Sequence, residues 1–229
     1  MGYGTVKTLT DTSVRNCVGD IRAFRPTIMV GVPAVWELIR KGIMTKVKAG
    51  GAIKSSIFNG ALSMKKAGGP GSTFASIADA VVFKQVQQGT GGRLKLALSG
   101  GAPISKATQE FLSTALVMVV QGYGMTESCA CVPHFHLFFP SIRFRTDLTL
   151  RSMCAILPPD FHRYGAVGIP VPSCEIKLVD VEEANYFSSN TVPQGEILIR
   201  GPSVTKGYCT STLSPVFASS SDGFCDTIR

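Results

Sequence analysis

Residues 91–128 decide the fold class, and they read GGRLKLALSGGAPISKATQEFLSTALVMVVQGYGMTES. The apolar run Leu94–Ser99 predicts a strand, and the two glycines that follow predict a tight turn. Ile104–Ala115 predicts a helix, and Val117–Gln121 predicts a second strand that leads into another glycine-rich loop. The residues expected on the buried side of the helix are Ile104, Ala107, Phe111, Leu112 and Ala115. Strand, helix and strand at this spacing form a βαβ unit, so we expect an α/β domain with a parallel sheet flanked by helices.

A further strand and helix precede this unit. Thr27–Val32 is β-branched and apolar, which predicts a buried strand. Pro33 suits the first turn of a helix, where a missing N–H costs nothing. The helix should bury one face, because apolar residues recur in it every four positions. They are Val35, Ile39, Ile43 and Val47, with Leu38 beside them. We interpret Trp36, at the edge of this face, as a core residue, and we expect more helices over 52–67 and 74–88.

The pattern changes beyond Tyr164. Apolar Cys174, Ile176 and Leu178 alternate with Glu175 and Lys177, which predicts a strand that is exposed on one side. Residues 195–204, GEILIRGPSV, again have the character of a short strand. Glycine and proline separate these segments, so we expect antiparallel strands in a small subdomain that resembles a distorted β-barrel.

Composition limits the classes of partner. The 229 residues include 23 Lys and Arg against 15 Asp and Glu, a net charge of +8. The positive charge is dispersed instead of forming a stripe, so we expect no nucleic-acid partner but favourable contacts with phosphates, nucleotides and acidic lipid surfaces. The seven cysteines are odd in number and irregular in spacing, which favours a reducing compartment over a disulfide framework.

Two loops are expected to leave neighbouring strand ends, where ligands of α/β sheets bind. One is SGGAP from Ser99, and the other is QGYGMTES from Gln121. Glycine backbone N–H groups can cradle phosphate oxygens. Tyr123 offers a flat face to a base, Thr126 a hydroxyl to a phosphate, and Glu127 a hard oxygen ligand to Mg²⁺. The alternative is that both loops are ordinary tight turns, because neither the dinucleotide fingerprint nor the Gly-Lys-Ser/Thr ending of a P-loop is present.

Several longer blocks, in order, carry a family resemblance. They are GYGTVKTLTD, RPTIMVGVPAVWELIRKG, LALSGGAPIS, QGYGMTES, MCAILPPDFHRYGAVGIPVPSCEIKLVDV and GEILIRGPSVTKGY. Together they resemble the AMP-forming long-chain fatty acid–CoA ligases of the adenylate-forming superfamily, over Gly2–Tyr208 with one interruption. The resemblance implies a partial α/β AMP-binding subdomain at 1–130, a β subdomain at 153–208 and an irregular tail at 209–229. The interruption, residues 131–152, is an insert that we interpret as aberrant.

The same resemblance implies a site and a reaction. The turn expected against the adenine of ATP or AMP comprises Gly100, Gly101, Ala102 and Pro103. The loop expected to hold the adenylate comprises Gln121, Gly122, Tyr123, Gly124, Met125 and Thr126. Thr126 and Glu127 would be the catalytic residues, and Glu127 would bind Mg²⁺. A fatty acid carboxylate would attack the α-phosphate of ATP, and coenzyme A would then displace AMP.

The implied partners are a long-chain fatty acid, ATP and coenzyme A, with possible peripheral membrane contact. The implied location is intracellular, either cytosolic or on the cytoplasmic face of the endoplasmic reticulum, lipid droplet or peroxisome membrane. The family's phosphate loop and its adenylation lysine have no counterpart in the sequence, and Asp226 cannot be equated with the family's ribose aspartate. We therefore expect little or no ligase activity from this chain alone. The alternative is a non-catalytic nucleotide-binding protein with the same fold.

Three interpretations of the insert compete. Its removal joins Ala130 to Met153 and restores the family's spacing, which supports the third of them. One is a zinc site, from Cys129, Cys131, His134 and His136. Another is a lipid-facing loop, with the apolar tip Phe135, Leu137, Phe138 and Phe139 flanked by Arg143, Arg145 and Arg151. We favour the third, translated non-coding sequence, because the segment has neither helical nor alternating periodicity.

Overall fold

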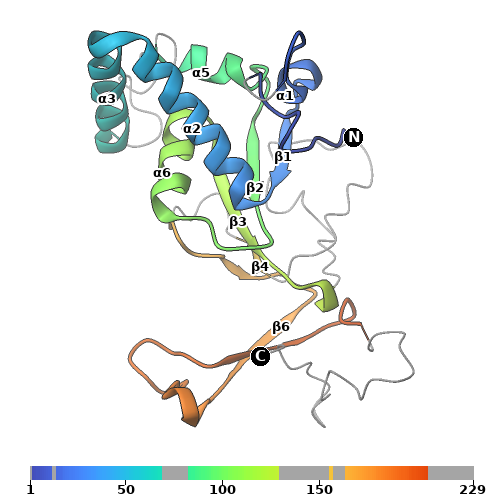
Figure 1. Ribbon diagram of the computed structural model, residues 1–229. Helices are drawn as coiled ribbons and strands as arrows, with labels where there is room; N and C mark the ends of the chain where they lie inside the picture. Colours follow the sequence, from blue (N-terminus) through green and yellow to red (C-terminus); the bar gives the residue numbers. More distant parts are fainter. Residues whose placement is uncertain (1, 12–13, 69–81, 129–154, 157–162, 206–229) are drawn as a thin grey trace. The chain divides into compact units, whose positions relative to one another are not determined.

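The computed structural model describes residues 2–11, 14–68, 82–128, 155–156 and 163–205 (Figure 1). They fall into two compact units. The first comprises residues 1–121 with Arg163–Ala166, and the second comprises residues 122–162 with 167–229. Among the described residues, no helix is both long and apolar enough to cross a bilayer.

The sheet of the first unit is parallel, as the sequence predicts. Strand β1 (Ile28–Gly31) pairs with β2 (Leu96–Ser99), and β2 pairs with β3 (Val119–Tyr123), both in parallel. All four residues of β2 are buried. Two helices pack against each other beside this sheet, α2 (Pro33–Ala49) and α6 (Lys106–Ala115), and α2 crosses in front of the strands in Figure 1.

Helix α2 begins at Pro33, as predicted, and buries the expected face. Ile39 is 5% exposed, and Val35, Ile43 and Val47 pack against the core around it. Trp36 is fully buried, and its Nε1–H donates to the carbonyl of Gly31 at 3.2 Å. The interpretation of Trp36 as a core residue is therefore confirmed, because its indole ties the start of α2 to the end of β1.

Helix α6 differs from the prediction on one side. Ile104, Phe111, Leu112 and Ala115 are buried as expected, but Ala107 is exposed. Ser105 ends the preceding turn as the N-cap, and its hydroxyl accepts the backbone N–H of Thr108. This cap turns Ala107 to solvent in the first helical turn and places Thr108 and Gln109 inside, because their polar groups find partners there.

Three further helices complete the described part of this unit. They are α1 (Asp20–Phe24), α3 (Gly51–Gly68) and α5 (Lys84–Gly89). The helix expected over 74–88 is described only in its second part, since residues 69–81 lie outside the described ranges. Phe58 of α3 joins the helical layer, with its ring 5.5 Å from that of Phe83 and 6.2 Å from that of Phe111.

The second unit contains antiparallel pairs. The end of β3 pairs with β4 (Ala155–Ile156), and β4 pairs with β5 (Ile169–Pro170). A separate ladder joins β6 (Glu175–Val179) to β7 (Glu196–Arg200). Short 3-10 turns lie at η2 (Thr126–Ser128) and η3 (Glu182–Ala184).

The fold is therefore α/β with a mixed sheet, parallel from β1 to β3 and antiparallel from β3 to β5. The antiparallel strands predicted beyond Tyr164 are confirmed, and β6 alternates exposed and half-buried side chains from Glu175 to Leu178. The barrel-like closure is not seen among the described residues, where the β6–β7 ladder has two strands and cannot close on itself.

Candidate functional site

The turn Gly100–Pro103 follows directly from β2 and is shaped by its backbone. The N–H of Gly100 donates to the carbonyl of Gly31 at 3.2 Å, which continues the sheet bonding for one more residue. Gly101 has a φ of +79°, a backbone conformation that favours glycine. The conformation, and not a lack of space, is the reason, because the nearest atom to an added Cβ would be Val32 Cγ1 at 3.7 Å. Gly101, Ala102 and Pro103 are exposed. The turn therefore presents nearly bare backbone to a ligand.

A polar network holds the end of this turn against α2. Ser105 donates to Glu37 Oε1 at 3.3 Å, and the hydroxyl of Thr108 donates to the same carboxylate oxygen. Arg40 donates in turn to Thr108 Oγ1 at 2.8 Å. Because side chains of both helices contribute, the network fixes the start of α6 relative to α2. The exposed turn leads directly into α6, so its position is fixed as well.

Two buried polar side-chain atoms have no hydrogen-bond partner among the described residues, one at the carboxyl end of β2 and one in the middle of β3. Ser99 and Gln121 are direct partners in the parallel register, and they are 0% and 3% exposed. Within the described residues, neither Ser99 Oγ nor Gln121 Oε1 has a hydrogen-bond partner. Buried polar groups are bonded in the large majority of cases, so an unsatisfied pair on two neighbouring interior strands indicates a place where a ligand or a water completes the bonding.

The second loop follows β3 in the other unit. Gly122 pairs with Ile156 and Tyr123 with Ala155, so both residues belong to the antiparallel ladder. Gly122 is buried, Tyr123, Gly124 and Met125 are half-buried, and Thr126 is exposed.

Ser128 sets the shape of that loop. Its hydroxyl donates to the carbonyl of Met125 at 2.9 Å and lies 3.0 Å from the Met125 nitrogen, whose N–H it accepts. The sequence analysis included Ser99 and Ser128 in the two expected ligand loops but assigned a role to neither.

The predicted site residues are thus placed in two groups. Gly100–Pro103 and Gln121 lie in the first unit, and Gly122–Glu127 lie in the second. At Glu127 the structure describes the backbone, in η2, and its role as a metal ligand stays a prediction. No group of three or more His, Cys, Asp or Glu side chains in the described ranges could hold a metal ion. The zinc and lipid interpretations of the insert fall on residues outside those ranges.

Gln109 fixes the segment Arg163–Ala166 in the first unit. Its Nε2 donates to the carbonyl of Val119 at 3.0 Å, and its Oε1 accepts the N–H of Gly165 at 2.9 Å. Burial raises the pKa of the neighbouring Tyr164 phenol, and the charge of Glu110 raises that pKa further. The Tyr164 phenol therefore stays protonated near neutral pH.

A family model described as "AMP-binding enzyme" matches residues 4–209. The chain belongs to the AMP-binding enzyme family. Within this family, long-chain-fatty-acid–CoA ligase 2 of Schizosaccharomyces pombe is 40% identical over 232 residues, which cover 99% of this chain and 30% of the relative. The chain is thus a partial homologue of long-chain fatty acid–CoA ligases and spans about 30% of their length.

Solved structures of AMP-binding enzymes have the same fold. The adenylation domain of a carboxylate reductase from Mycobacterium chelonae superposes with a TM-score of 0.54 at 25% identity, covering 91% of this chain and 25% of that one. The A-PCP didomain of a carboxylic acid reductase from Segniliparus rugosus, in complex with AMP, superposes with a TM-score of 0.52 at 25% identity, covering 91% and 22%. The predicted resemblance is confirmed at the level of the family.

Proposed function

We propose that this chain is the central, adenylate-holding part of a long-chain fatty acid–CoA ligase. The observation that carries the proposal is the unsatisfied acceptor Gln121 Oε1, which is buried in the middle of β3. Its register partner Ser99 leads directly into the exposed glycine turn. A buried acceptor beside open backbone suits a flat heterocycle that carries a donor on its edge.

Adenine has the required chemistry. Its exocyclic amine is a donor for Gln121 Oε1, and its flat face can lie on the peptide planes of Gly100–Pro103, because Gly101 and Ala102 have little or no side chain to hold it away. An acceptor that is buried in the free protein makes a strong contribution when it is satisfied, since its loss of hydration has already been incurred. The AMP complex of the Segniliparus rugosus relative shows that this fold can hold AMP in another protein.

The proposed reaction has two steps. A fatty acid carboxylate oxygen attacks the α-phosphorus of ATP, the bond to pyrophosphate breaks, and an acyl-adenylate forms. The sulfur of coenzyme A then attacks the acyl carbonyl carbon, AMP leaves, and the thiol proton is released. Mg²⁺ would neutralise phosphate charge in the first step.

The second loop supplies the other roles in this proposal. Glu127 would hold Mg²⁺, Thr126 would donate to the phosphate, and Tyr123 would stack on the base. The half-buried position of Tyr123 and the exposed position of Thr126 are compatible with these roles. Use of coenzyme A, the peripheral membrane contact and the intracellular location stay predictions.

Binding tests this proposal better than turnover, because the chain spans about 30% of the relatives' length. We would titrate AMP and IMP into the 229-residue chain by calorimetry. IMP carries an oxygen in place of the exocyclic amine, so its acceptor would face Gln121 Oε1. We expect AMP to bind about tenfold more tightly than IMP, the value of one buried hydrogen bond.

The variant Gln121→Met should abolish this preference, because it keeps the volume of the side chain and removes the acceptor. Gln88→Met is the matched control, since Gln88 is exposed on α5 and should leave the preference unchanged. Equal affinity of the wild-type chain for AMP and IMP, or a preference that survives in Gln121→Met, would contradict the proposal.

A further inference from the structure

Helix α3 has apolar side chains on two sides. On the inner side, Phe58 is 3% exposed and Leu62 packs against the same core. On the other side, Ile53, Ile57 and Met64 are 78%, 56% and 52% exposed. A surface helix of a globular protein typically has one apolar stripe, which faces the core, and polar residues opposite it. Packing within the described part of this unit therefore does not explain the exposed apolar side of α3.

The exposed apolar side has a regular spacing. Ile53, Ile57, Gly60 and Met64 are separated by four, three and four residues, which places all four on one face of the helix. We call these four residues the outer stripe. Gly60 is exposed, and a Cβ built there would meet no atom within 4 Å. The outer stripe is therefore open along about 16 Å of helix, at 1.5 Å per residue.

Positive charge surrounds the outer stripe. Residues 41–68, which cover the second half of α2 and all of α3, contain six lysines and no aspartate or glutamate. Lys48 lies five residues before the stripe begins, and Lys54 follows its first residue. Both lysines are exposed, and none of the ion pairs found among the described residues engages either of them. The six lysines are Lys41, Lys46, Lys48, Lys54, Lys65 and Lys66.

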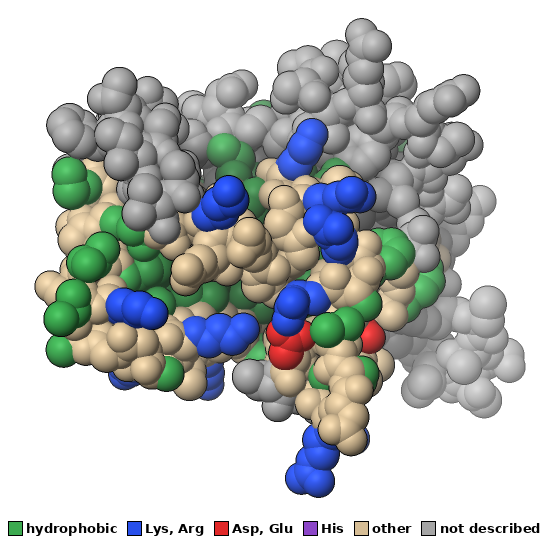
Figure 2. Space-filling view, turned by 90° about the horizontal axis from the view of Figure 1, so that it is seen from above, with side chains coloured by type: hydrophobic (Ala, Val, Ile, Leu, Met, Phe, Trp, Pro, Cys, Tyr) green, Lys and Arg blue, Asp and Glu red, His purple; other side chains and the backbone are tan. Residues whose placement is uncertain are grey.

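Two acidic side chains near this region are already engaged. Glu110 of α6 binds Lys66 at 3.1 Å. Asp11 accepts the N–H of Gly19 at 2.9 Å and the guanidinium of Arg22 at 2.7 Å. In Figure 2, seen from above, hydrophobic side chains lie among Lys and Arg side chains, and the acidic side chains in view gather at one place. The charge that the outer stripe presents to a partner is therefore positive.

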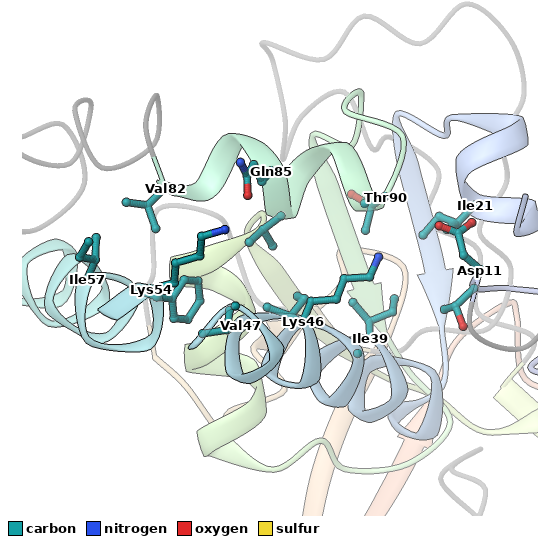
Figure 3. A pocket seen from close by; sticks show the side chains of 17 residues that line it. Asp11, Ile21, Ile39, Lys46, Val47, Lys54, Ile57, Val82, Gln85 and Thr90 are labelled. Carbon is teal, nitrogen blue, oxygen red and sulfur yellow. The ribbon is translucent and has the colours of Figure 1, made fainter. Parts of the chain in front are cut away.

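A cavity of about 450 Å³ adjoins α3 and extends the apolar surface (Figure 3). It lies among α2, α3 and α5, and most of the residues in its wall are aliphatic or aromatic. Ile57 and Lys54 belong both to this wall and to the exposed side of α3. In Figure 3, Ile57, Lys54 and Lys46 follow one another along the wall. Apolar surface therefore continues from the outer stripe into the cavity, with amines at its edge.

An apolar stripe among charges of one sign selects the kind of partner. A second copy of the chain would place the same patch against itself in a two-fold dimer, so that lysines would face lysines. An anionic bilayer instead offers negative charge at its surface and apolar material just below its head groups. Helices that carry lysines beside an apolar face lie in this interface, with the face buried about 5–10 Å deep.

We propose that the outer stripe, together with Lys48 and Lys54, is a docking surface for an anionic lipid bilayer. The side chains of Ile53, Ile57 and Met64 lie at the boundary between head groups and acyl chains, and the lysine amines lie among the phosphates. This contact needs no helix that crosses the bilayer, and none is found among the described residues. It uses α2 and α3 alone, so it rests neither on the nucleotide site nor on residues 131–152.

Co-sedimentation with vesicles is the first test. We expect the 229-residue chain to bind vesicles of phosphatidylcholine and phosphatidylserine about thirtyfold more tightly than vesicles of phosphatidylcholine alone, since Lys48 and Lys54 each contribute a factor of about five near an anionic surface. Binding should weaken in 1 M salt, where charges are screened within about 3 Å. Hydrogen exchange on the mixed vesicles should slow in α3 and stay unchanged in β6 and β7.

A variant that gains affinity tests the outer stripe without any risk from misfolding. Gly60→Leu adds an apolar side chain in the middle of the stripe, where there is space for it. We expect about tenfold tighter binding to the mixed vesicles, the lower value for burying one leucine side chain. Gly60→Gln is the matched control, because it adds a side chain of similar length and helix propensity without the apolar gain. It should leave the affinity nearly unchanged.

Loss of apolar side chains should have the opposite effect. Ile53→Asn with Met64→Gln should weaken binding to the mixed vesicles at least tenfold, since burying one such side chain contributes a factor of about ten or more. Val192→Asn with Val18→Gln is the control, because these residues lie outside α3 and are 72% and 52% exposed. Affinity for AMP should be the same in both double variants.

The lysines have their own matched control. Lys48→Gln with Lys54→Gln should weaken binding to the mixed vesicles about thirtyfold and leave binding to phosphatidylcholine alone unchanged. Lys7→Gln with Lys177→Gln removes the same charge from exposed positions outside α2 and α3, and it should have no effect.

Four results would overturn the proposal. One is equal affinity for the two kinds of vesicle, or no binding to either. Another is equal affinity in each variant and its control. The third is binding of dihexanoylphosphatidylserine, held below its critical micelle concentration, as tightly as the mixed vesicles, because that outcome assigns the lysines to a site for one head group. The fourth is a dimer in analytical ultracentrifugation that Ile53→Asn with Met64→Gln dissociates, because that outcome assigns the outer stripe to a second copy.

Discussion

The parallel sheet of the first unit and the β6–β7 ladder of the second bury their side chains in different ways. All four residues of β2 are buried, including the polar Ser99. In β6, Glu175 and Lys177 are exposed and alternate with half-buried Ile176 and Leu178. A polar group in β2 must therefore find its partner inside the protein or in a ligand, whereas one on the exposed side of the ladder has water beside it.

A polar atom without a hydrogen-bond partner therefore points to a ligand when it is buried in the first sheet. On the exposed side of the β6–β7 ladder the same atom would simply bind water. Gln121 Oε1 is buried within the first sheet, so its lack of a partner within the described residues supports the proposed contact with a ligand. Glu175 and Arg200 form an exposed cross-strand pair, which solvent would satisfy in any case. The predictions below test whether the two sheets differ in the energies that hold them together.

The largest expected effect is that of Leu112→Ala in α6. Leu112 is fully buried in the core, so the substitution leaves a cavity and should lower the free energy of unfolding by about 2–5 kcal/mol. Urea denaturation measures the loss, and hydrogen exchange with mass spectrometry locates it. Exchange should accelerate in α6 and β2 and stay unchanged in β6 and β7. Val30→Ala, at a half-exposed position of β1, should cost far less. Equal acceleration in the ladder would contradict the distinction between the sheets.

Gln109→Leu should have the next largest effect. The substitution leaves the carbonyl of Val119 and the N–H of Gly165 without their partner, which costs about 1–3 kcal/mol in a buried setting. Urea denaturation gives the total loss, and faster exchange at Gly165 would show that the segment Arg163–Ala166 has been released. Gln88→Leu on the exposed side of α5 should change neither.

Ser105→Ala should cost about 1 kcal/mol, because it removes the N-cap of α6. Thermal unfolding detects the change, and exchange should accelerate first at Thr108, whose N–H loses the hydroxyl of Ser105 as an acceptor and keeps the Ser105 carbonyl at 3.0 Å. Ser63→Ala is the control, since Ser63 is exposed within α3 and alanine favours a helix interior. A melting temperature equal to that of the control would show that the cap does not stabilise the turn.

The smallest effect is expected in the ladder. A double-mutant cycle with Glu175→Gln and Arg200→Gln should give a coupling of about 0.2–1 kcal/mol, because the two exposed residues face each other across the strands. The coupling should fall in 1 M salt, where charges are screened within about 3 Å. A coupling above about 2 kcal/mol, or one that salt does not change, would mean that the ladder is held together like the buried sheet.

The sequence predicted most of the first unit because its periodicity is strong. The run Thr27–Val32 and the apolar face of α2 have the lengths and spacings that packing requires, and the structure places β1 and α2 there. Two-residue strands are different. β4 and β5 have no room for a period, so pairing partners far away in the chain decide their conformation.

The candidate site was predicted in part. The glycines of the turn are visible in sequence because a φ of +79° favours glycine at Gly101. The sequence cannot show that Ser99 Oγ and Gln121 Oε1 lack hydrogen-bond partners among the described residues, because that depends on which groups the fold places beside them. The cavity was missed for a related reason. Its wall combines α2, α3 and α5 with Asp11 and Ile21, which only tertiary packing brings together.

Trp36 gives the chain a built-in optical probe. It is the single tryptophan of the sequence, it is fully buried, and it belongs to the first unit. Emission excited at its indole band therefore reports on the junction of β1 and α2 alone, without any tryptophan signal from the second unit. A red shift on denaturation would time the opening of that junction, while the far-ultraviolet dichroism of the whole chain records both units. Any separation between the two signals would measure how independently the units unfold.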